Sequence, residues 1–206
     1  MSKGSSSNRW RRRQARDEFV RRARSEGWRS RAVYKLMEIQ QRDRLIRSGD
    51  TVLDVGAAPG SWSQYAASVV GASGRVVAVD LLAIQPIPGV DCIQGDFGDE
   101  SILAQVLETL DGQPVDLVIS DMAPNISGNR SVDQPRVMYL ADIALDVARR
   151  ALKPGGAFVV KLFHGEGFDD FVRQARAMFE TVRVRKPGAS RARSPETYLV
   201  ARNYRL

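Results

Sequence analysis

The chain has 206 residues, of which 43% are apolar, and carries a formal net charge of +7 at pH 7. This length suits one domain with a substantial core rather than two, and no apolar run approaches the roughly 20 residues that span a bilayer. A lone Cys92 and a lone His164 exclude an internal disulfide and a Cys/His zinc cluster, so we expect Lys, Asp and Glu to carry any chemistry.

The two ends of the chain are strongly basic. Residues 1–31 carry a net charge of +8 and residues 183–206 carry +6, which leaves −7 on the residues between them. Basic ends on an acidic body are typical of proteins that bind a polyanion, and Trp10, Phe19 and Trp28 add rings that can stack on bases. The alternative is a solvated basic tail that binds nothing.

The N-terminal segment shows no sign of a targeting sequence. Its first residues lack the apolar stretch of a secretory signal, so we expect a soluble, cytoplasmic protein. Residues 1 to about 25 are rich in Ser and then in Arg, with little apolar periodicity, and we expect them to be mobile without a ligand. We therefore divide the chain into a basic, flexible tail over residues 1–28 and a single domain over residues 29–206.

Regular periodicity begins at Ser30. A helix that carries Lys35 in its first turns is predicted to end near residues 41–44, and short apolar runs then alternate with helical segments. The predicted strands are 51–55, 75–80, 90–93, 115–121, 157–163, 182–185 and 198–201, and the helices after the first strand are 62–70, 100–110, 136–152 and 168–179. This alternation predicts an α/β fold, a mostly parallel seven-stranded sheet with helices on both faces.

A Gly-rich loop follows the first predicted strand and has the sequence DVGAAPGSW from Asp54 to Trp62. Ligands of such sheets bind beyond the carboxyl ends of the strands, where glycines let the backbone approach closely. Ala58 stands where the dinucleotide fingerprint has its second glycine, which argues against a pyrophosphate ligand. A nucleoside that carries a carboxylate fits the helix N-terminus better.

Two aspartates close the next two predicted strands. Asp80 is placed to accept hydrogen bonds from a ribose diol, and Asp96 is placed near an adenine amino group. Each aspartate alone is weak evidence, because loop aspartates commonly cap helices or form turns. Together with Gly56 and Gly60 they favour an adenosine-type cofactor, for which S-adenosylmethionine is the natural candidate.

Two charged residues lie in otherwise apolar runs. Asp121 closes the run VDLVISD, and Lys161 interrupts AFVVKLF. A charge in such a run is unfavourable unless it is paired or functional. We expect the fold to bring Lys35 and Glu196 to the same point, so that the four residues form a candidate catalytic cluster. The competing interpretation is that Lys161 lies on an edge strand and reaches solvent.

These motifs, taken in order, resemble the FtsJ/RrmJ family of bacterial ribosomal RNA ribose 2′-O-methyltransferases. The resemblance runs from about residue 29 to residue 201 and includes SRAVYKL from Ser30, LDVGAAPGSWS from Leu53, DLL from Asp80, SDMAPN from Ser120, VKLF from Val160 and SRARS from Ser190. It implies a Rossmann-like, S-adenosylmethionine-dependent methyltransferase fold. It also implies a K-D-K-E catalytic tetrad, which falls on Lys35, Asp121, Lys161 and Glu196.

The same resemblance implies cofactor contacts at Gly60, Trp62, Asp80, Asp96 and Asp121, with S-adenosylmethionine as methyl donor and no metal. The usual target of the family is a uridine in the A-loop of the peptidyl-transferase centre, in 23S rRNA of the assembled 50S subunit. We therefore expect that particle as the partner, no membrane partner and a monomeric enzyme.

The sequence departs from the family pattern at two positions within these motifs. Ser61 replaces a glycine that is frequent in the loop, and Pro195 precedes Glu196. Because a proline restricts the residue before it to extended conformations, the placement of Glu196 is the least constrained of the four.

The resemblance implies that Lys161 accepts the proton of the ribose hydroxyl. Burial and a neighbouring cation such as Lys35 favour the neutral, proton-accepting form of a lysine, whereas Asp121 and Glu196 favour the charged form. Lys35 and Asp121 are expected to position Lys161 and the hydroxyl, with Glu196 in support. The alternatives are a methyltransferase for transfer RNA or another RNA, a non-catalytic RNA-binding protein and a nicotinamide oxidoreductase.

Three further residues have structural interpretations. Cys92 lies in an apolar strand and is expected in the core. Trp62 either packs in the core or lines the cofactor pocket. His164 is expected to hold a loop or to face substrate rather than to act as a base.

Overall fold

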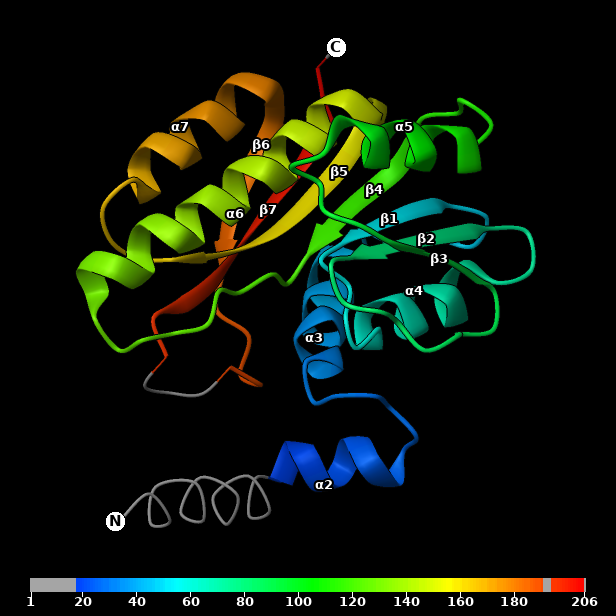
Figure 1. The fold of residues 1–206 in the computed structure, drawn as a ribbon, viewed down its shortest axis with the longest axis horizontal. Coiled ribbons are helices and arrows are strands. Elements are labelled where there is room, and N and C mark those ends of the chain that lie inside the picture. Colours follow the sequence, from blue (N-terminus) through cyan, green and yellow to red (C-terminus); the bar gives the residue numbers. More distant parts are fainter. Residues whose placement is uncertain (1–17, 191–193, 206) are drawn as a thin grey trace.

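The computed structural model describes residues 18–190 and 194–205. Its strands form one seven-stranded sheet in the order β3-β2-β1-β4-β5-β7-β6 (Figure 1). The pairs among the first five strands are parallel, and β7 is antiparallel to both β5 and β6. The strands are β1 (Thr51–Val55), β2 (Arg75–Asp80), β3 (Val90–Gln94), β4 (Val115–Ser120), β5 (Leu152–Phe163), β6 (Phe179–Arg185) and β7 (Glu196–Tyr204). The predicted α/β fold with a mostly parallel sheet is confirmed.

Helices cover both faces of the sheet, as predicted (Figure 1). The helices are α2 (Glu18–Ser25), α3 (Val33–Asp43), α4 (Ser61–Val70), α5 (Glu100–Thr109), α6 (Arg130–Ala151) and α7 (Phe168–Met178). One core packs α5, α6 and α7 against the sheet through residues such as Val106 and Phe171, and a second packs α3 and α4 through Leu36 and Ala66. All five of the parallel strands therefore point their carboxyl ends to one edge of this layered structure.

Several elements begin earlier than the sequence predicts, and the difference is largest for β5 and α6. Strand β5 begins at Leu152 instead of residue 157, because Leu152 pairs with Val115 and an irregularity in the pairing with β4 accommodates the residues before Ala157. Helix α6 begins at Arg130 instead of residue 136, because the side chain of Asn129 accepts a hydrogen bond from the backbone N–H of Ser131 and caps it.

Helix α2 corrects the expectation of an irregular segment up to about residue 25, of which residues 1–17 lie outside the described part. Phe19 and Ala23, four residues apart, form a short apolar stripe. The ring of Phe19 lies 5.5 Å from that of Tyr34, and Ala23 is buried against the same residue and its neighbours. Too few apolar positions repeat in this Arg-rich stretch for periodicity to reveal the helix.

The expectation that Cys92 lies in the core is wrong, because its side chain is exposed. It belongs to β3, the edge strand of the sheet, where Ile93 is the buried residue. An edge strand has a neighbouring strand on one side alone, so part of it faces solvent. The charged residue Asp91, directly before Cys92, is typical of such a strand.

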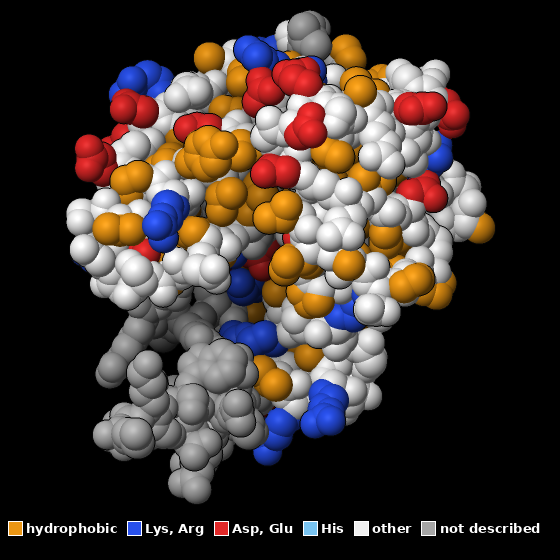
Figure 2. Space-filling view, viewed as in Figure 1, with side chains coloured by type: hydrophobic (Ala, Val, Ile, Leu, Met, Phe, Trp, Pro, Cys, Tyr) orange, Lys and Arg blue, Asp and Glu red, His pale blue; other side chains and the backbone are white. Residues whose placement is uncertain are grey.

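The charges are unevenly distributed over the surface. Figure 2 shows Asp and Glu side chains gathered on the upper part of this face, over the helical layer of α5, α6 and α7, and Lys and Arg side chains towards α2 and α3. Within residues 18–190 and 194–205, no helix is long and apolar enough to cross a membrane.

Candidate active site

Four charged side chains meet at the carboxyl-end edge of the sheet. Lys161 lies near the end of β5, and Asp121 follows β4 directly. The Lys161 ammonium donates to the Asp121 carboxylate at 2.9 Å and to its backbone carbonyl at 2.6 Å. The Lys161 side chain is only 6% exposed, so the interpretation that it merely reaches solvent does not hold. The structure therefore pairs the two charges that interrupt the apolar runs.

The remaining two members of the cluster come from other elements. Lys35, in the first turn of α3, lies 2.9 Å from Glu196 Oε1 and 3.6 Å from Asp121 Oδ2. Glu196 is the first residue of β7 and pairs in register with Phe163. Its carboxylate also accepts a hydrogen bond of 2.8 Å from the hydroxyl of Ser190. Two lysines and two carboxylates thus alternate around one point, which we call the tetrad.

Tyr198 is a further member of this network that sequence reasoning missed. Its hydroxyl donates to Asp121 Oδ1 at 2.6 Å, and its ring lies 5.7 Å from the Lys35 ammonium. Tyr198 is fully buried, and burial, followed by the charges of Asp121 and Glu196, raises its pKa well above the ordinary value. A signal was present, because alternate residues of a strand share one face and Tyr198 lies two residues after Glu196.

The pKa of Asp121 reflects its position between two cations. Burial raises this pKa, but the ammonium groups of Lys161 and Lys35 and the hydroxyl of Tyr198 lower it by more, so that the net pKa is below the ordinary value. The ionised carboxylate therefore stabilises the fold above the ordinary carboxyl pKa, and this contribution is lost as the pH falls through the lowered value. Asp121 is negatively charged wherever the enzyme would work.

The Gly-rich loop between β1 and α4 lies beside the tetrad. Gly56 and Gly60 have φ of +75° and +98°, which side chains of L-residues rarely adopt. A Cβ on Gly56 would lie 1.9 Å from Met122 Cγ, and one on Gly60 would lie 2.5 Å from Ile87 Cδ1. Because the first backbone N–H groups of a helix lack partners within it, the start of α4 offers donors at the point where the loop ends.

Replacing Gly60 by alanine is expected to lower the affinity for S-adenosylmethionine at least tenfold. The new methyl group would strain the backbone and displace Ile87 from the loop at once. Isothermal titration measures the affinity. Gly71→Ala is the matched control, because Gly71 ends the same helix with φ of +69° and no atom lies within 4 Å of the point that its new methyl group would occupy. Equal affinities for the two variants would show that the loop does not hold the cofactor.

Asp80 and Asp96 lie where the sequence predicts, at the ends of β2 and β3. The Asp80 carboxylate accepts hydrogen bonds from the backbone N–H groups of Ala58 and Leu82, both at 2.8 Å. A carboxylate has about four acceptor positions, so two remain for a ligand. The exposed Asp96 accepts one bond of 2.8 Å from the N–H of Gly98. Both aspartates thus combine a structural role with free acceptor capacity.

The side chain of Trp62 belongs to the core. It is 2% exposed, its ring lies 5.7 Å from that of Tyr198, and its N–H donates to the carbonyl of Ala32 at 2.8 Å. The indole is therefore used in packing α4 against α3 and β7. What Trp62 can offer a cofactor is its backbone, in the first turn of α4.

Arg29 links the segment before α3 to the loops that follow β1 and β2. Its guanidinium donates to the carbonyls of Pro59, Gln85 and Pro86 at 3.0, 2.7 and 2.6 Å. Leu81 and Leu82, directly after Asp80, are 64% and 65% exposed. The Arg29 contacts fix the segment that carries these two apolar side chains.

A buried carboxyl lies beneath the loop. Asp54, in β1, is 1% exposed and accepts a hydrogen bond of 2.5 Å from the hydroxyl of Ser63. Burial raises the pKa of Asp54 to about 7, and the charges of Asp121 and Asp80 add to the effect. The native state therefore retains a proton that the unfolded chain releases at lower pH, so that the folding stability falls as the pH rises between the two pKa values.

Asp54→Asn should remove this pH dependence. The wild type is expected to lose about 4 kcal/mol of unfolding free energy between about pH 4 and pH 8 through this one group. The unfolding free energy of the variant should show no such loss. Urea denaturation across this range provides the measurement, with the exposed Asp111→Asn as control. Parallel curves for the wild type and Asp54→Asn would mean that Asp54 is ionised in the native state.

Sequence comparisons point in one direction. Residues 28–204 match the family model described as FtsJ-like methyltransferase. Proteins named ribosomal RNA large subunit methyltransferase E, from Pseudomonas aeruginosa and Pseudomonas paraeruginosa, are each 53% identical over 205 residues, covering 100% of this chain and 99% of the relative.

Solved structures agree with these matches. A protein assigned as a ribosomal RNA methyltransferase, from Plasmodium falciparum, has a TM-score of 0.78 at 27% identity and covers 86% of this chain and 98% of its own. Fibrillarin, in a complex with Nop5p, has a TM-score of 0.62 at 18% identity over 85% of each chain, a likeness of fold alone.

Proposed function

Because this chain belongs to the FtsJ-like methyltransferases, we propose that it methylates the ribose 2′-hydroxyl of a uridine in the A-loop of 23S rRNA, within the 50S subunit. The observation that carries the proposal is the tetrad, in which three ion pairs link Lys161 to Asp121, Asp121 to Lys35 and Lys35 to Glu196. An RNA-binding protein without catalysis has no need of a buried lysine paired with a carboxylate at the end of the sheet.

The cofactor side fits S-adenosylmethionine, the methyl donor that the family implies. Asp80 would hold the ribose diol and Asp96 the adenine amino group, with Leu81 and Leu82 packing against the base. Side chains at the two glycine positions would collide with Met122 and Ile87, and the backbone at Gly60 and Trp62 would face the ligand. The bound sulfonium supplies an already activated methyl group. Within the described residues, no cluster of His, Cys, Asp or Glu is arranged to hold a metal ion.

The chain's own residues would align the hydroxyl and take its proton. Lys161 is the proton acceptor in this proposal, because its ammonium nitrogen is fixed by two hydrogen bonds to Asp121. Asp121 holds the side-chain nitrogens of both Lys161 and Lys35 in place. Fixing a nucleophile in line with an activated group contributes a large part of such rate enhancements. Glu196 supports Lys35 through their ion pair.

Recognition of RNA would rest on the basic ends and on the face around the tetrad. We further propose a basic N-terminal segment over residues 1–28, which includes α2, a single methyltransferase domain over residues 29–206 and a monomer that acts on one large substrate. Arg191 and Arg193, which are candidates for phosphate contacts, lie outside the described residues. The relatives named for the ribosomal large subunit, which are similar along the whole chain, favour 23S rRNA over transfer RNA.

Methyl transfer tests the proposal directly. Labelled S-adenosylmethionine is supplied with 50S subunits that lack the modification, with protein-free rRNA and with transfer RNA, and the labelled nucleotide is mapped. Label on the ribose of an A-loop uridine is the expected result. Label on transfer RNA alone would retain the chemistry and replace the substrate. Absence of label despite cofactor binding would contradict all three acceptors.

A further inference from the structure

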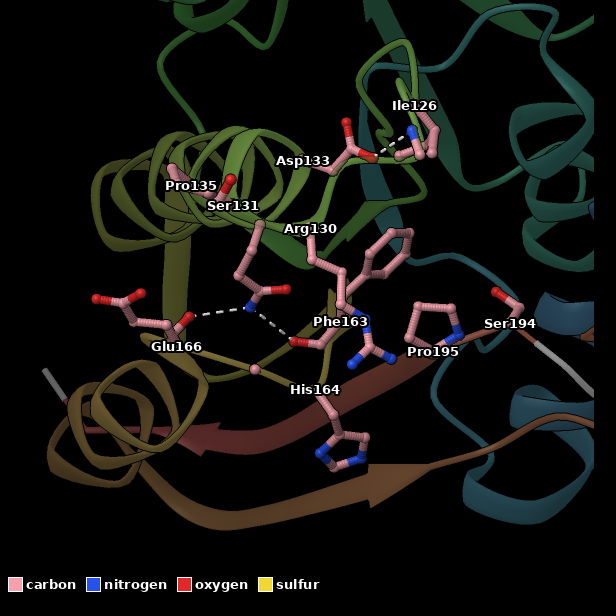
Figure 3. A pocket seen from close by; sticks show the side chains of 13 residues that line it. Ile126, Arg130, Ser131, Asp133, Pro135, Phe163, His164, Glu166, Ser194 and Pro195 are labelled. Carbon is pink, nitrogen blue, oxygen red and sulfur yellow. Dashed lines mark hydrogen bonds between the residues drawn. The ribbon is translucent and has the colours of Figure 1, made fainter.

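A pocket of about 460 Å³ lies beside the tetrad, between the start of α6 and the ends of β5 and β7 (Figure 3). Its volume is within the range of roughly 300–1,000 Å³ that is typical of small-molecule sites. Phe163 and Pro195 line it, and each adjoins a member of the tetrad: Phe163 pairs in register with Glu196, which Pro195 precedes. The proposed mechanism does not use this pocket.

The pocket lies at a short, defined distance from the proposed proton acceptor. Lys161 and Phe163 are two residues apart in β5, so their side chains share one face of the strand and their backbones are about 7 Å apart. This spacing is comparable with the step from one nucleotide to the next along an RNA strand. A ribose held at Lys161 would therefore place a neighbouring nucleotide at the mouth of the pocket.

The polar groups of the pocket present a fixed acceptor. The side-chain amide of Gln134 donates to the carbonyls of Phe163 and Glu166, at 3.1 and 2.9 Å (Figure 3). Since only the –NH₂ group can donate to two carbonyls, the orientation of the amide is set and Oε1 is the acceptor that remains. The nearby Asp133 is satisfied within its own loop, by the N–H and hydroxyl of Ser127 and the N–H of Gly128.

The other walls are flat and apolar or carry a planar cation. Phe163 and Pro195 supply apolar surface, and Figure 3 shows Arg130 extending from the start of α6 towards their level. His164 also lines the pocket, and its ring packs against Phe168 at 4.3 Å. Bases of single-stranded RNA stack on aromatic rings and on guanidinium planes, and their ring N–H and amino groups donate to acceptors.

We propose that this pocket holds an unpaired nucleobase of the nucleotide next to the one that is methylated. The inference rests on the proposed function, because it requires an RNA strand at the tetrad. A phosphate fits the pocket less well, since the acceptor Gln134 Oε1, the carboxylate of Glu166 and the apolar walls offer an anion little. The pocket thus contributes to the choice of target by requiring a base that can leave its stack.

Kinetics with 50S subunits that lack the modification test the proposal. Phe163→Leu, which keeps an apolar side chain and removes the ring, should lower kcat/KM about tenfold and leave the affinity for S-adenosylmethionine unchanged. Arg130→Ala should lower it too, whereas Arg136→Ala, on the same helix and outside the pocket, should change it less than twofold. If Arg130 instead holds a phosphate, Arg130→Ala will reduce the slope of log kcat/KM against log salt concentration by about one. That result would contradict the stacking of Arg130 on a base.

A cross-link locates the occupant. Phe163 is replaced by the photoreactive p-benzoylphenylalanine, and the adduct on the 50S particle is mapped by the stop it causes in reverse transcription. An adduct on a nucleotide adjacent to the methylated one, which stops reverse transcription one nucleotide to its 3′ side, is the expected result. Adducts elsewhere in the RNA, or no adduct although methyl transfer proceeds, would overturn the pocket assignment. Absence of transfer by the wild-type enzyme would instead contradict the proposed function.

Discussion

Replacing Lys161 by methionine is expected to lower the rate of methyl transfer about 100-fold or more, with the affinity for S-adenosylmethionine nearly unchanged. General base catalysis typically contributes factors of this size, and the variant removes the nitrogen that would accept the proton. Methionine has a similar length and suits a site where the side chain is 6% exposed, so the fold should persist. Single-turnover transfer of label to 50S subunits measures the effect on the chemical step.

The matched control is Lys153→Met, in the same strand. Lys153 lies at the opposite end of β5, forms an ion pair with Asp116 and is 47% exposed. It should leave turnover within about twofold of the wild type, since exposed ion pairs contribute little. Unchanged turnover in Lys161→Met would refute its role as proton acceptor. Equal losses in the two variants would indicate a general effect of removing positive charge on RNA binding.

Much of the fold is predictable because strands and helices alternate with clear periodicity. The bounds of β1 and β2 follow directly from apolar runs between polar residues. Prediction of the tetrad relies on two further facts, that Asp121 and Lys161 interrupt apolar runs and that parallel strands end at one edge of a sheet. The structure brings the four side chains together, and their catalytic roles remain proposals.

Other features depend on packing between distant segments and leave little trace in the sequence. Helix α2 is held by contacts of Phe19 and Ala23 with α3, which periodicity over eight residues does not reveal. Trp62 was an open choice between core and pocket, and the hydrogen bond to Ala32 places its ring in the core. The pocket beside Phe163 forms where α6, which begins earlier than the sequence predicts, meets two strand ends.

Asp121→Asn is expected to lower kcat/KM about 100-fold and to change the pH dependence of folding stability in a defined direction. Asparagine retains the shape and an acceptor for Tyr198, but it removes the negative charge that lies 2.9 Å from Lys161 and 3.6 Å from Lys35. Lys161 would then lose the carboxylate with which it is paired, and Lys35 would keep Glu196 alone. The ammonium groups would no longer be held where the alignment of the hydroxyl with the methyl group requires them. If the substrate still binds, kcat should fall.

The pH dependence of folding stability separates the charge of Asp121 from its shape. Burial raises the pKa of Asp121, but the ammonium groups of Lys161 and Lys35 and the hydroxyl of Tyr198 lower it by more, so that it lies below the ordinary value. The wild type should therefore lose unfolding free energy as the pH falls from the ordinary carboxyl pKa through the lowered value, whereas Asp121→Asn, which has no carboxylate to protonate there, should lack this loss. Urea denaturation across the acid range measures it, and Asp116→Asn, which removes a charge from the same strand away from the tetrad, should keep the loss that Asp121 causes. An equal acid loss in Asp121→Asn and in the wild type would contradict the view that the Asp121 carboxylate is stabilised by the two ammonium groups.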